Sequence, residues 1–247
     1  FGADAWKQLF PEQGNPKELK TFETIKGAKY TAVSTPGDIL LHIRAKQMGL
    51  CFEFASIIDE KLKGVVDSID ETHGFRYMDG KAIIGFVDGT ENPAVDENPY
   101  HFAVIGDEDP DFIGGSYVFV QKYIHDMTAW NSLPVEAQEK VIGRHKYNDV
   151  ELSDEEKPQN AHNAVTNIGD DLKIVRANMP FANTSKGEYG TYFIGYASTF
   201  STTHKMLENM FIGDPVGNTG RLLDFSTPIT GTLFFAPSYD LLAKLGE

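Results

Sequence analysis

The chain has 247 residues, of which 41% are hydrophobic, and no apolar run approaches twenty residues. This composition predicts a soluble globular protein with a sizeable core and excludes a membrane span. The 22 basic and 36 acidic residues give a net charge of −14, which disfavours nucleic acid or an anionic membrane as a partner. The single cysteine, Cys51, has no partner for an internal disulfide, which is typical of the reducing cytoplasm.

The first half of the chain alternates short extended and helical patterns. Apolar residues at helical spacing predict a short helix over residues 5–10, and strands are predicted at residues 30–33 and 39–43. A longer amphipathic helix is predicted from residue 48 to 65, because apolar side chains recur there at steps of three and four. Residues 66–87 then return to an extended pattern.

The most informative stretch is residues 83–93, with the sequence IIGFVDGTENP. It indicates an apolar strand that ends at Asp88 and is followed by a turn. Gly89 permits this turn, and Asn92-Pro93 disfavours continuation of the chain as a helix or a strand. Such a turn would hold the Asp88 carboxylate in place for proton transfer. The alternative, from these residues alone, is an ordinary Asp-Gly hairpin turn.

The second half of the chain predicts the order strand, helix, strand, strand, helix, strand, which is a ferredoxin-like unit. If the first half is a duplicate of it, a leading strand and helix are missing before Phe1. The predicted fold class is therefore α+β, with two ferredoxin-like units and antiparallel sheets, divided into residues 1–112 and 113–247. The predicted elements of the second half are strands at 116–124, 172–178, 189–198 and 232–236, and helices at 126–143 and 202–210.

Three residues of this second half are candidates for chemistry. Arg176 and Asn178 lie two apart in a predicted strand, so a cation and an amide share one face. His162 follows a long polar segment and belongs to no amphipathic stripe, although most histidines are surface or satisfied core residues. For Arg176 the alternative is an ion pair with Asp88 that closes the domain.

Residues 85–93 resemble the GxxDG motif of dye-decolorizing peroxidases, a family of haem enzymes. Other landmarks of that family follow in order at residues 37–45, 114–117, 125–126 and 207–211. The ordered set is more specific than any single motif, and it is most similar to the shorter, bacterial, cytoplasmic type. The resemblance implies one non-covalently held haem b per chain.

The resemblance also implies roles for the candidate residues. His162 would be the proximal ligand of the haem iron, Asp88 would move the proton of bound hydrogen peroxide, and Arg176 would stabilise developing negative charge. Asn178 would position peroxide or water. Asp224 or Glu151 would accept a hydrogen bond from His162, the alternatives being a turn cap for Asp224 and a solvated charge for Glu151.

Further residues are expected to hold the cofactor. Arg144 would pair with a haem propionate, its alternative being a favourable charge at a helix carboxyl end. The remaining expected contacts are Gly89 and Thr90, and the apolar side chains of Val165, Ile194, Phe211 and Phe234, which are otherwise plain core residues.

The function implied is that of a haem peroxidase, which reduces hydrogen peroxide and oxidises one-electron donors such as dyes and phenolic compounds. Small-molecule reductants are the expected partners, and the chain is expected to form a homo-oligomer. One alternative is a haem carrier or iron-release protein without significant turnover. A second is a non-haem metal enzyme that uses Asp88, Glu91 and His162, against which the lack of paired histidine motifs argues.

Overall fold

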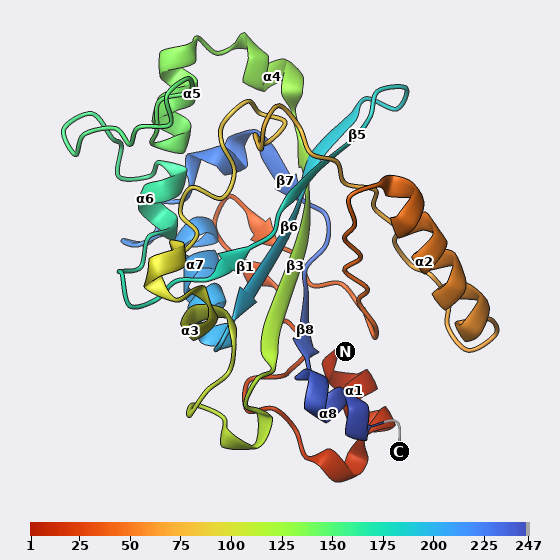
Figure 1. The fold of residues 1–247 in the computed structure, drawn as a ribbon. Coiled ribbons are helices and arrows are strands. Elements are labelled where there is room, and N and C mark those ends of the chain that lie inside the picture. Colours follow the sequence, from red (N-terminus) through yellow and green to blue (C-terminus); the bar gives the residue numbers. More distant parts are fainter. Residues whose placement is uncertain (246–247) are drawn as a thin grey trace.

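The computed structural model describes residues 1–245 and is built on a six-stranded antiparallel sheet, shown in Figure 1. The hydrogen-bonded order is β4-β6-β3-β7, with β5 pairing to β6 and β8 pairing to β3. The strands are β3 (Ser116–His125), β4 (Val175–Arg176), β5 (Met179–Asn183), β6 (Glu188–Ala197), β7 (Ser226–Pro228) and β8 (Thr232–Ala236).

The central pair of the sheet, β3 and β6, sets the two faces on which the rest of the chain packs. Its register runs from Tyr117 opposite Ala197 to Ile124 opposite Gly190. Because side chains alternate along a strand, Phe119 faces the main hydrophobic core while its neighbour Val118 belongs to a separate cluster on the other face.

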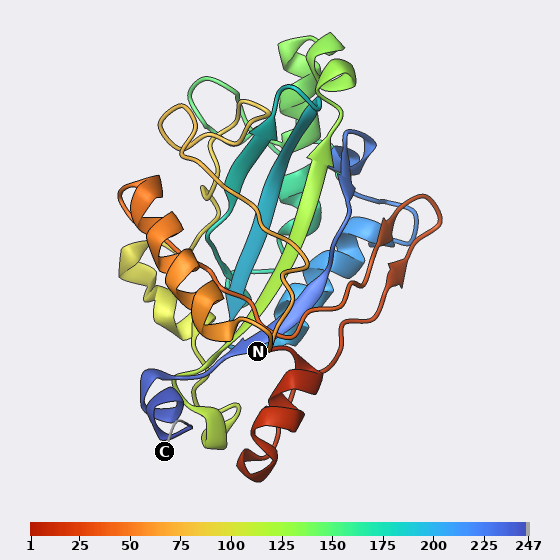
Figure 2. The ribbon, with the colours of Figure 1, turned by 90° about the vertical axis from the view of Figure 1, so that its right-hand side faces the viewer.

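Helices lie on both sides of this sheet, as Figures 1 and 2 show: α6 and α7 cover one face and α2 lies over the other. The helix α7 buries Leu207, Met210 and Phe211 in the main core with Phe119, which fixes it against the sheet. The helices are α1 (Ala3–Leu9), α2 (Met48–Leu62), α3 (Pro99–Ala103), α4 (Met127–Ser132), α5 (Val135–Ile142), α6 (His162–Thr166), α7 (Phe200–Phe211) and α8 (Tyr239–Lys244), with 3-10 turns at Pro11–Gln13, Val95–Glu97, Pro110–Phe112 and Arg221–Asp224.

The start of the chain is packed against the last strand of the sheet. Backbone hydrogen bonds join Phe1 and Phe235 in both directions, at 2.8 Å each. Trp6 is fully buried, and its ring meets the Phe235 ring edge-on with centroids 5.0 Å apart. The helix α1 therefore shares its hydrophobic core with β8.

The second half has the predicted order of elements, and the α+β fold class with antiparallel strands is confirmed. Of the predicted strand at 172–178 only β4 (Val175–Arg176) is formed, and a second strand, β5, begins after it at Met179; both pair with β6. The predicted second half runs to residue 247, and its last two residues lie outside the described part of the chain. Within residues 1–245, no helix combines the length and the apolar character needed to cross a bilayer.

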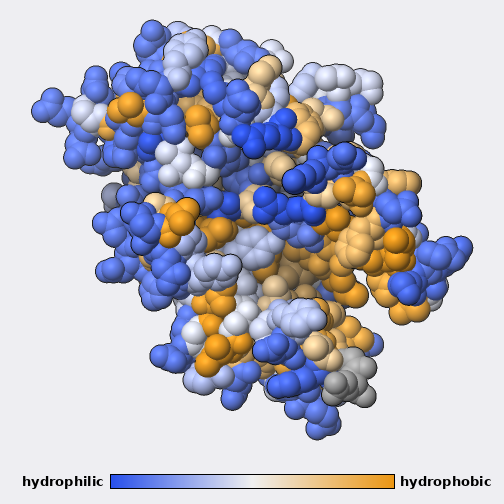
Figure 3. All heavy atoms as spheres, in the orientation of Figure 1, coloured by the Kyte–Doolittle hydropathy of each residue, from blue (hydrophilic) through white to orange (hydrophobic). Residues whose placement is uncertain are grey.

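The first half departs from the predicted strands. It contains only a two-stranded ribbon of β1 (Ile25–Lys26) and β2 (Thr31–Ala32), while the stretches 39–43 and 66–77 form no strand in the described chain. The predicted long helix is present as α2, but none of its residues is buried. Phe52 is 65% exposed, and Figure 3 shows apolar side chains gathered over this region. Periodicity predicted the helix correctly, whereas burial depends on what packs against it.

Candidate active site

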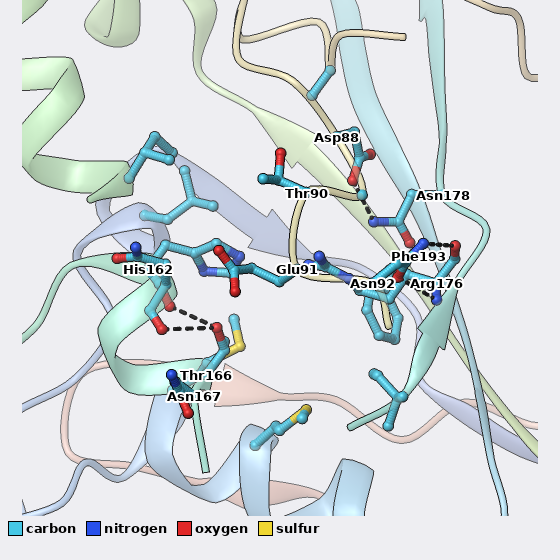
Figure 4. Close-up of a pocket in the computed structure, with 18 of the residues that line it drawn as sticks. Asp88, Thr90, Glu91, Asn92, His162, Thr166, Asn167, Arg176, Asn178 and Phe193 are labelled. Atoms are coloured by element: carbon cyan, nitrogen blue, oxygen red, sulfur yellow. Dashed lines mark hydrogen bonds between the residues drawn. The ribbon is translucent and has the colours of Figure 1, made fainter. Parts of the chain in front are cut away.

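A cavity of about 420 Å³ opens between the sheet and the helices α6 and α7, a size typical of sites for small organic ligands. Figure 4 shows His162 on one side of it and Asp88, Asn178 and Arg176 on the other. Asp88 precedes His162 by 74 positions in the chain, so only tertiary folding brings these two residues to one cavity. The predicted site residues that line it are Asp88, Gly89, Thr90, Arg144, His162, Arg176 and Asn178.

Asp88 is held by a tight loop, not by the strand that the sequence predicted. The loop closes with a single bridge between Lys81 and Val87, and the Asp88 amide donates to the Gly80 carbonyl at 3.0 Å. Gly89 has φ of 86°, in the left-handed region that favours glycine, so the chain turns directly after the carboxylate. The predicted fixed turn is present, although the preceding residues are not part of a sheet.

The base of this loop is anchored in its own hydrophobic cluster. The indole nitrogen of Trp130, on α4, donates to the Ile84 carbonyl at 2.9 Å, and the ring meets that of Phe86 edge-on. Ile84, Phe86 and Trp130 are all buried. The apolar pattern that suggested a strand thus reflects burial of a loop against α4.

Asn178 fixes the orientation of Asp88. Its side-chain nitrogen donates to Asp88 Oδ1 at 3.1 Å, while its oxygen accepts from the backbone amide of Ile194 at 3.1 Å. With both ends of the amide engaged, Asn178 has one rotational state that serves both partners. Asn178 therefore acts on Asp88 directly.

Arg176 presents an unpaired guanidinium to the cavity. Asn92 clamps its backbone through two hydrogen bonds of 2.9 Å, which fixes the point from which the side chain leaves β4. Burial lowers the pKa of Arg176, and the nearby charges of Asp88 and Glu91 oppose that effect. No carboxylate within residues 1–245 lies within 4.0 Å of it, so the alternative of a closing ion pair with Asp88 is not formed. Its charge is available to a ligand.

His162 is the first residue of α6 and is neutral. Burial, and then the charge of Arg176, lower the pKa of His162 to about 4. Its Nδ1 atom is buried and has no hydrogen-bond partner among the described residues. A neutral imidazole with an unsatisfied nitrogen beside a cavity has the chemistry of an iron ligand, so this residue fits a haem.

Asp224 lies away from His162. Its carboxylate accepts hydrogen bonds from Lys29 and Tyr30 at the surface, on the far side of a 3-10 turn. Since His162 Nδ1 has no partner within residues 1–245, the prediction that Asp224 accepts from it does not hold in this structure. Lys29 and Tyr30, from the first half of the chain, bind the Asp224 carboxylate instead, and its side chain is 40% exposed.

Glu151 is also engaged elsewhere, although it is closer to α6. It accepts from Lys157 Nζ at 2.7 Å and from Asn163 Nδ2 at 3.0 Å. It therefore contacts the residue next to His162 and not the imidazole itself. The prediction for Glu151 is corrected in the same way.

Arg144 lines the cavity with its guanidinium already bound to protein carboxylates. Its Nη1 donates to Glu91 Oε1 at 2.7 Å, and its Nε donates to Asp149 Oδ1 at 3.0 Å. The side chain is 15% exposed. An Arg144 bond to a cofactor carboxylate would exchange with, or add to, these contacts.

The four apolar residues predicted to line the cofactor are core residues instead. Val165 and Phe211 belong to the main core, while Ile194 and Phe234 pack together on the opposite face of the sheet. None of the four is among the residues that line the cavity. These predictions are wrong because strand alternation places Ile194 away from the cavity and its neighbour Phe193 toward it. The apolar lining includes Ile174, Phe193, Met206, Leu207, Met210 and Leu222.

A row of polar residues on β3 also lines the cavity, although the sequence did not single these residues out as part of the site. Gln121, Tyr123 and His125 point into the cavity side of the sheet, and the Tyr123 hydroxyl donates to Gln121 Oε1 at 2.5 Å. The His125 ring nitrogens lie 2.7 Å from Ser226 Oγ and 2.9 Å from Thr191 Oγ1. Burial lowers the pKa of His125 to about 4. Their alternate spacing in the strand was the signal that could have found them.

Fold and cavity together define an α+β protein whose ligand site lies between His162 on one side and Asp88 and Arg176 on the other. Residues 1–76 match the family described as Dyp-type peroxidase, N-terminal, and residues 79–241 match Dyp-type peroxidase, C-terminal. The chain belongs to the dye-decolorizing peroxidase family, and its activity is that of a peroxidase. The resemblance seen in the sequence is thereby confirmed.

Individual relatives agree over nearly the whole chain. Dye-decolorizing peroxidases from Rhodococcus erythropolis and Mycobacterium tuberculosis are 54% and 53% identical; the matches cover 98% of this chain and 72% and 73% of theirs. A crystal structure of such a peroxidase from Bacteroides thetaiotaomicron is 87% identical, with a TM-score of 0.99 over 100% of this chain and 80% of that one. DyPB from Rhodococcus jostii is 50% identical, with a TM-score of 0.95 and the same coverage.

Proposed function

We propose that in this peroxidase His162 holds the iron of one haem b, and that Asp88, Arg176 and Asn178 act on hydrogen peroxide at the opposite side of the cavity. The observation that carries the proposal is that His162, whose buried Nδ1 has no hydrogen-bond partner within residues 1–245, lines the same cavity as Arg176, whose guanidinium has no ion pair within those residues. A variant of the Rhodococcus jostii enzyme, 50% identical, was solved in complex with haem. That complex supports the predicted cofactor.

The haem, when bound, supplies the iron that takes oxidising equivalents from peroxide and passes them to one-electron donors. This chain supplies the proton transfer. Asp88, oriented by Asn178, would accept a proton from one oxygen of hydrogen peroxide and deliver it to the departing oxygen, which would leave as water. The Arg176 guanidinium stabilises the negative charge that develops on that departing oxygen. Neither step needs these two side chains to touch each other.

Two alternatives have less support. A haem carrier would use the same cavity, but it would not need an oriented Asp88 or a free Arg176, and the family is one of peroxidases. A non-haem metal enzyme would need clustered ligands, and no group of three or more His, Cys, Asp or Glu side chains suited to a metal occurs within residues 1–245. Both alternatives are separated from the peroxidase by the experiment below.

The broader setting is part of the same proposal. The substrates are hydrogen peroxide and small-molecule reductants, with no particular electron donor proposed. The chain works in the cytoplasm as a homo-oligomer. The single cysteine supports the cytoplasmic setting. A relative from Mycobacterium smegmatis, 55% identical with a TM-score of 0.94, was solved as an encapsulated peroxidase, which describes that protein. The two halves 1–112 and 113–247 stay a prediction.

The test is an absorption spectrum of haem-reconstituted protein, recorded before and milliseconds after mixing with one equivalent of hydrogen peroxide. We expect a Soret band that requires His162 and changes promptly with peroxide. His162→Ala should lose the band, whereas the control His204→Ala, on the outer part of α7, should keep it. A stable band indifferent to peroxide would favour the carrier, and no band in the wild-type protein would overturn the proposal.

A further inference from the structure

Arg144 is held mainly by a single residue, Asp149, through both its backbone and its side chain. Arg144 Nη2 donates to the Asp149 carbonyl at 2.6 Å, and Nε donates to the same carbonyl at 3.1 Å and to Asp149 Oδ1 at 3.0 Å. A guanidinium bound along one edge by two oxygens of one residue has little freedom to turn. Asp149 therefore decides which way the guanidinium points.

Asp149 makes these contacts from an uncommon backbone conformation. Its φ is 58°, in the left-handed region, which few residues other than glycine adopt and which asparagine and aspartate tolerate best. The turn is closed by the bond from the Asp149 amide to the His145 carbonyl at 3.1 Å and by the bond from the His145 amide to the Val150 carbonyl at 2.8 Å. In this conformation the carbonyl and the carboxylate of one residue reach the same guanidinium.

The second oxygen of the carboxylate reaches the loop that carries Asp88. Thr90 Oγ1 donates to Asp149 Oδ2 at 2.8 Å. Thr90 is two residues after Asp88, and Gly89 between them has the positive φ that makes the turn. One carboxylate thus ties Arg144 at the edge of the cavity to the loop of the proton-transfer residue, across 59 positions of sequence.

Glu91 and Glu151 approach the remaining nitrogen of Arg144, with Glu151 Oε2 3.9 Å from Nη1 and Glu91 in closer contact. Glu91 accepts from Nη1 at 2.7 Å, but its side chain is 45% exposed, compared with 26% for Asp149. Nη1 is the part of the guanidinium that Asp149 does not bind. A ligand carboxylate can therefore replace Glu91 while Asp149 keeps its three contacts.

We infer that Asp149 is a positioning residue, which aims Arg144 at a carboxylate of the bound cofactor and at the same time holds the Asp88 loop through Thr90. The inference rests on the proposed function, since it assumes that a haem occupies the cavity. Asp149 itself does not touch the reacting atoms. Its effect on haem retention passes through Arg144, and its effect on the reaction with peroxide passes through Thr90.

Three variants separate the contributions of Asp149. Asp149→Gly keeps the left-handed backbone and the carbonyl but removes the carboxylate. Asp149→Asn keeps an oxygen for Arg144 and places an amide nitrogen near Thr90, without the negative charge. Arg144→Ala removes the group on which Asp149 is inferred to act, and it provides the background for a double-mutant cycle.

The first measurement is the rate of haem transfer from the loaded protein to excess apomyoglobin, followed by the Soret band. Loss of an orienting partner of a cofactor ligand typically costs about 10- to 100-fold, so we expect Asp149→Gly to release haem at least about tenfold faster. Asp149→Asn should release haem at a rate much closer to that of the wild-type protein than Asp149→Gly does. In the Arg144→Ala background, Asp149→Gly should add little.

The second measurement is the rate constant for the reaction of the loaded protein with hydrogen peroxide. Asp149→Gly should lower it, and so should Thr90→Val, which removes the hydroxyl that donates to Asp149 Oδ2. Urea unfolding of the haem-free variants checks that each is folded. If Asp149→Gly does not fold, Asp149→Asn is the test variant. Asp149→Asn should match the wild-type protein in both rate constants more closely than Arg144→Ala does.

Several results would overturn the inference. Asp149→Gly could release haem and react with peroxide as the wild-type protein does, or its effect on the rate of haem release could be equally large with and without Arg144. Asp149→Asn could be as impaired as Arg144→Ala, which would make charge, and not orientation, the decisive property. In each case the wild-type protein still binds haem and the proposed function stands; if the wild-type protein binds no haem, the proposed function fails and the inference falls with it.

Discussion

Asn178 holds Asp88 by a hydrogen bond of 3.1 Å from its side-chain nitrogen to the Asp88 carboxylate. The other end of the Asn178 amide accepts from the backbone of Ile194, so the sheet itself sets the direction of the carboxylate. The proton-transfer residue lies on a loop, but its orientation comes from the rigid strand pair. Sites supported in this way keep their geometry better than sites formed by loops alone.

Asn178→Ala should therefore slow the reaction with peroxide without releasing haem. Asp88 keeps its place in the loop but loses its orientation, so we expect a loss of about tenfold to a hundredfold, smaller than the loss on removing an acid-base group outright. Stopped-flow absorbance with the loaded protein measures this rate constant. An unchanged rate would show that the loop alone orients Asp88.

Asp88→Asn and Arg176→Leu should both slow the reaction, by about a hundred- to ten-thousandfold where the group is essential. We expect the larger loss for Arg176→Leu. An asparagine at position 88 can still bind Asn178 and orient a water, whereas no other cation takes the place of the unpaired Arg176 charge in the described site. The Soret band shows that both variants are loaded. Equal losses, or a larger loss for Asp88→Asn, would contradict this order.

The stability of the haem-free protein should fall as the pH is lowered from about 6.5 to about 4. The pKa of buried His125 is lowered from 6.5 to about 4, so between these values the unfolded chain binds a proton that the folded chain does not. The stabilisation is complete above pH 6.5 and is lost progressively as the pH falls toward 4, with a magnitude of up to about 3 kcal/mol.

Urea unfolding at pH 7, 5.5 and 4.5 measures this effect, and His125→Gln is the informative variant. It should be less stable at pH 7, because the bonds to Ser226 and Thr191 are changed, but its stability should depend less on pH. His162 has a pKa lowered in the same way and leaves part of the slope. A pH dependence identical to that of the wild-type protein would show that His125 is not responsible.

Gly143→Ala should destabilise the protein by more than about 2 kcal/mol. Gly143 ends α5 with φ of 96°, and a Cβ atom there would lie 1.7 Å from Asn163 Oδ1. Gly187→Ala is the matched control, because Gly187 also has a positive φ, of 66°, but has open space around it. It should cost only the backbone strain, about 1 kcal/mol. Equal losses in urea unfolding would show that the contact with Asn163 adds nothing.

Much of the fold and several site residues were accessible from the sequence, because they depend on local regularities. Alternation along residues 116–124 predicted β3, and helical spacing predicted α2 and α7. The motif around Asp88 and the ordered landmarks indicated the family, which the relatives confirmed. The same patterns misled where apolar residues serve a loop, as at Ile84, because burial in a loop and burial in a strand leave the same composition.

The amino-acid sequence by itself determined the order of elements, the family and the residues with suitable chemistry, since backbone periodicity and motif spacing act over short distances. Tertiary structure alone decided which side chains meet. Asp224 binds Lys29 and not His162, while Asp149 joins Arg144 to Thr90. Such contacts depend on how strands and loops far apart in the chain are packed against one another. A hydrogen bond of about 3 Å forms or breaks when its two groups move by less than about 1 Å, and local sequence patterns do not specify positions that finely.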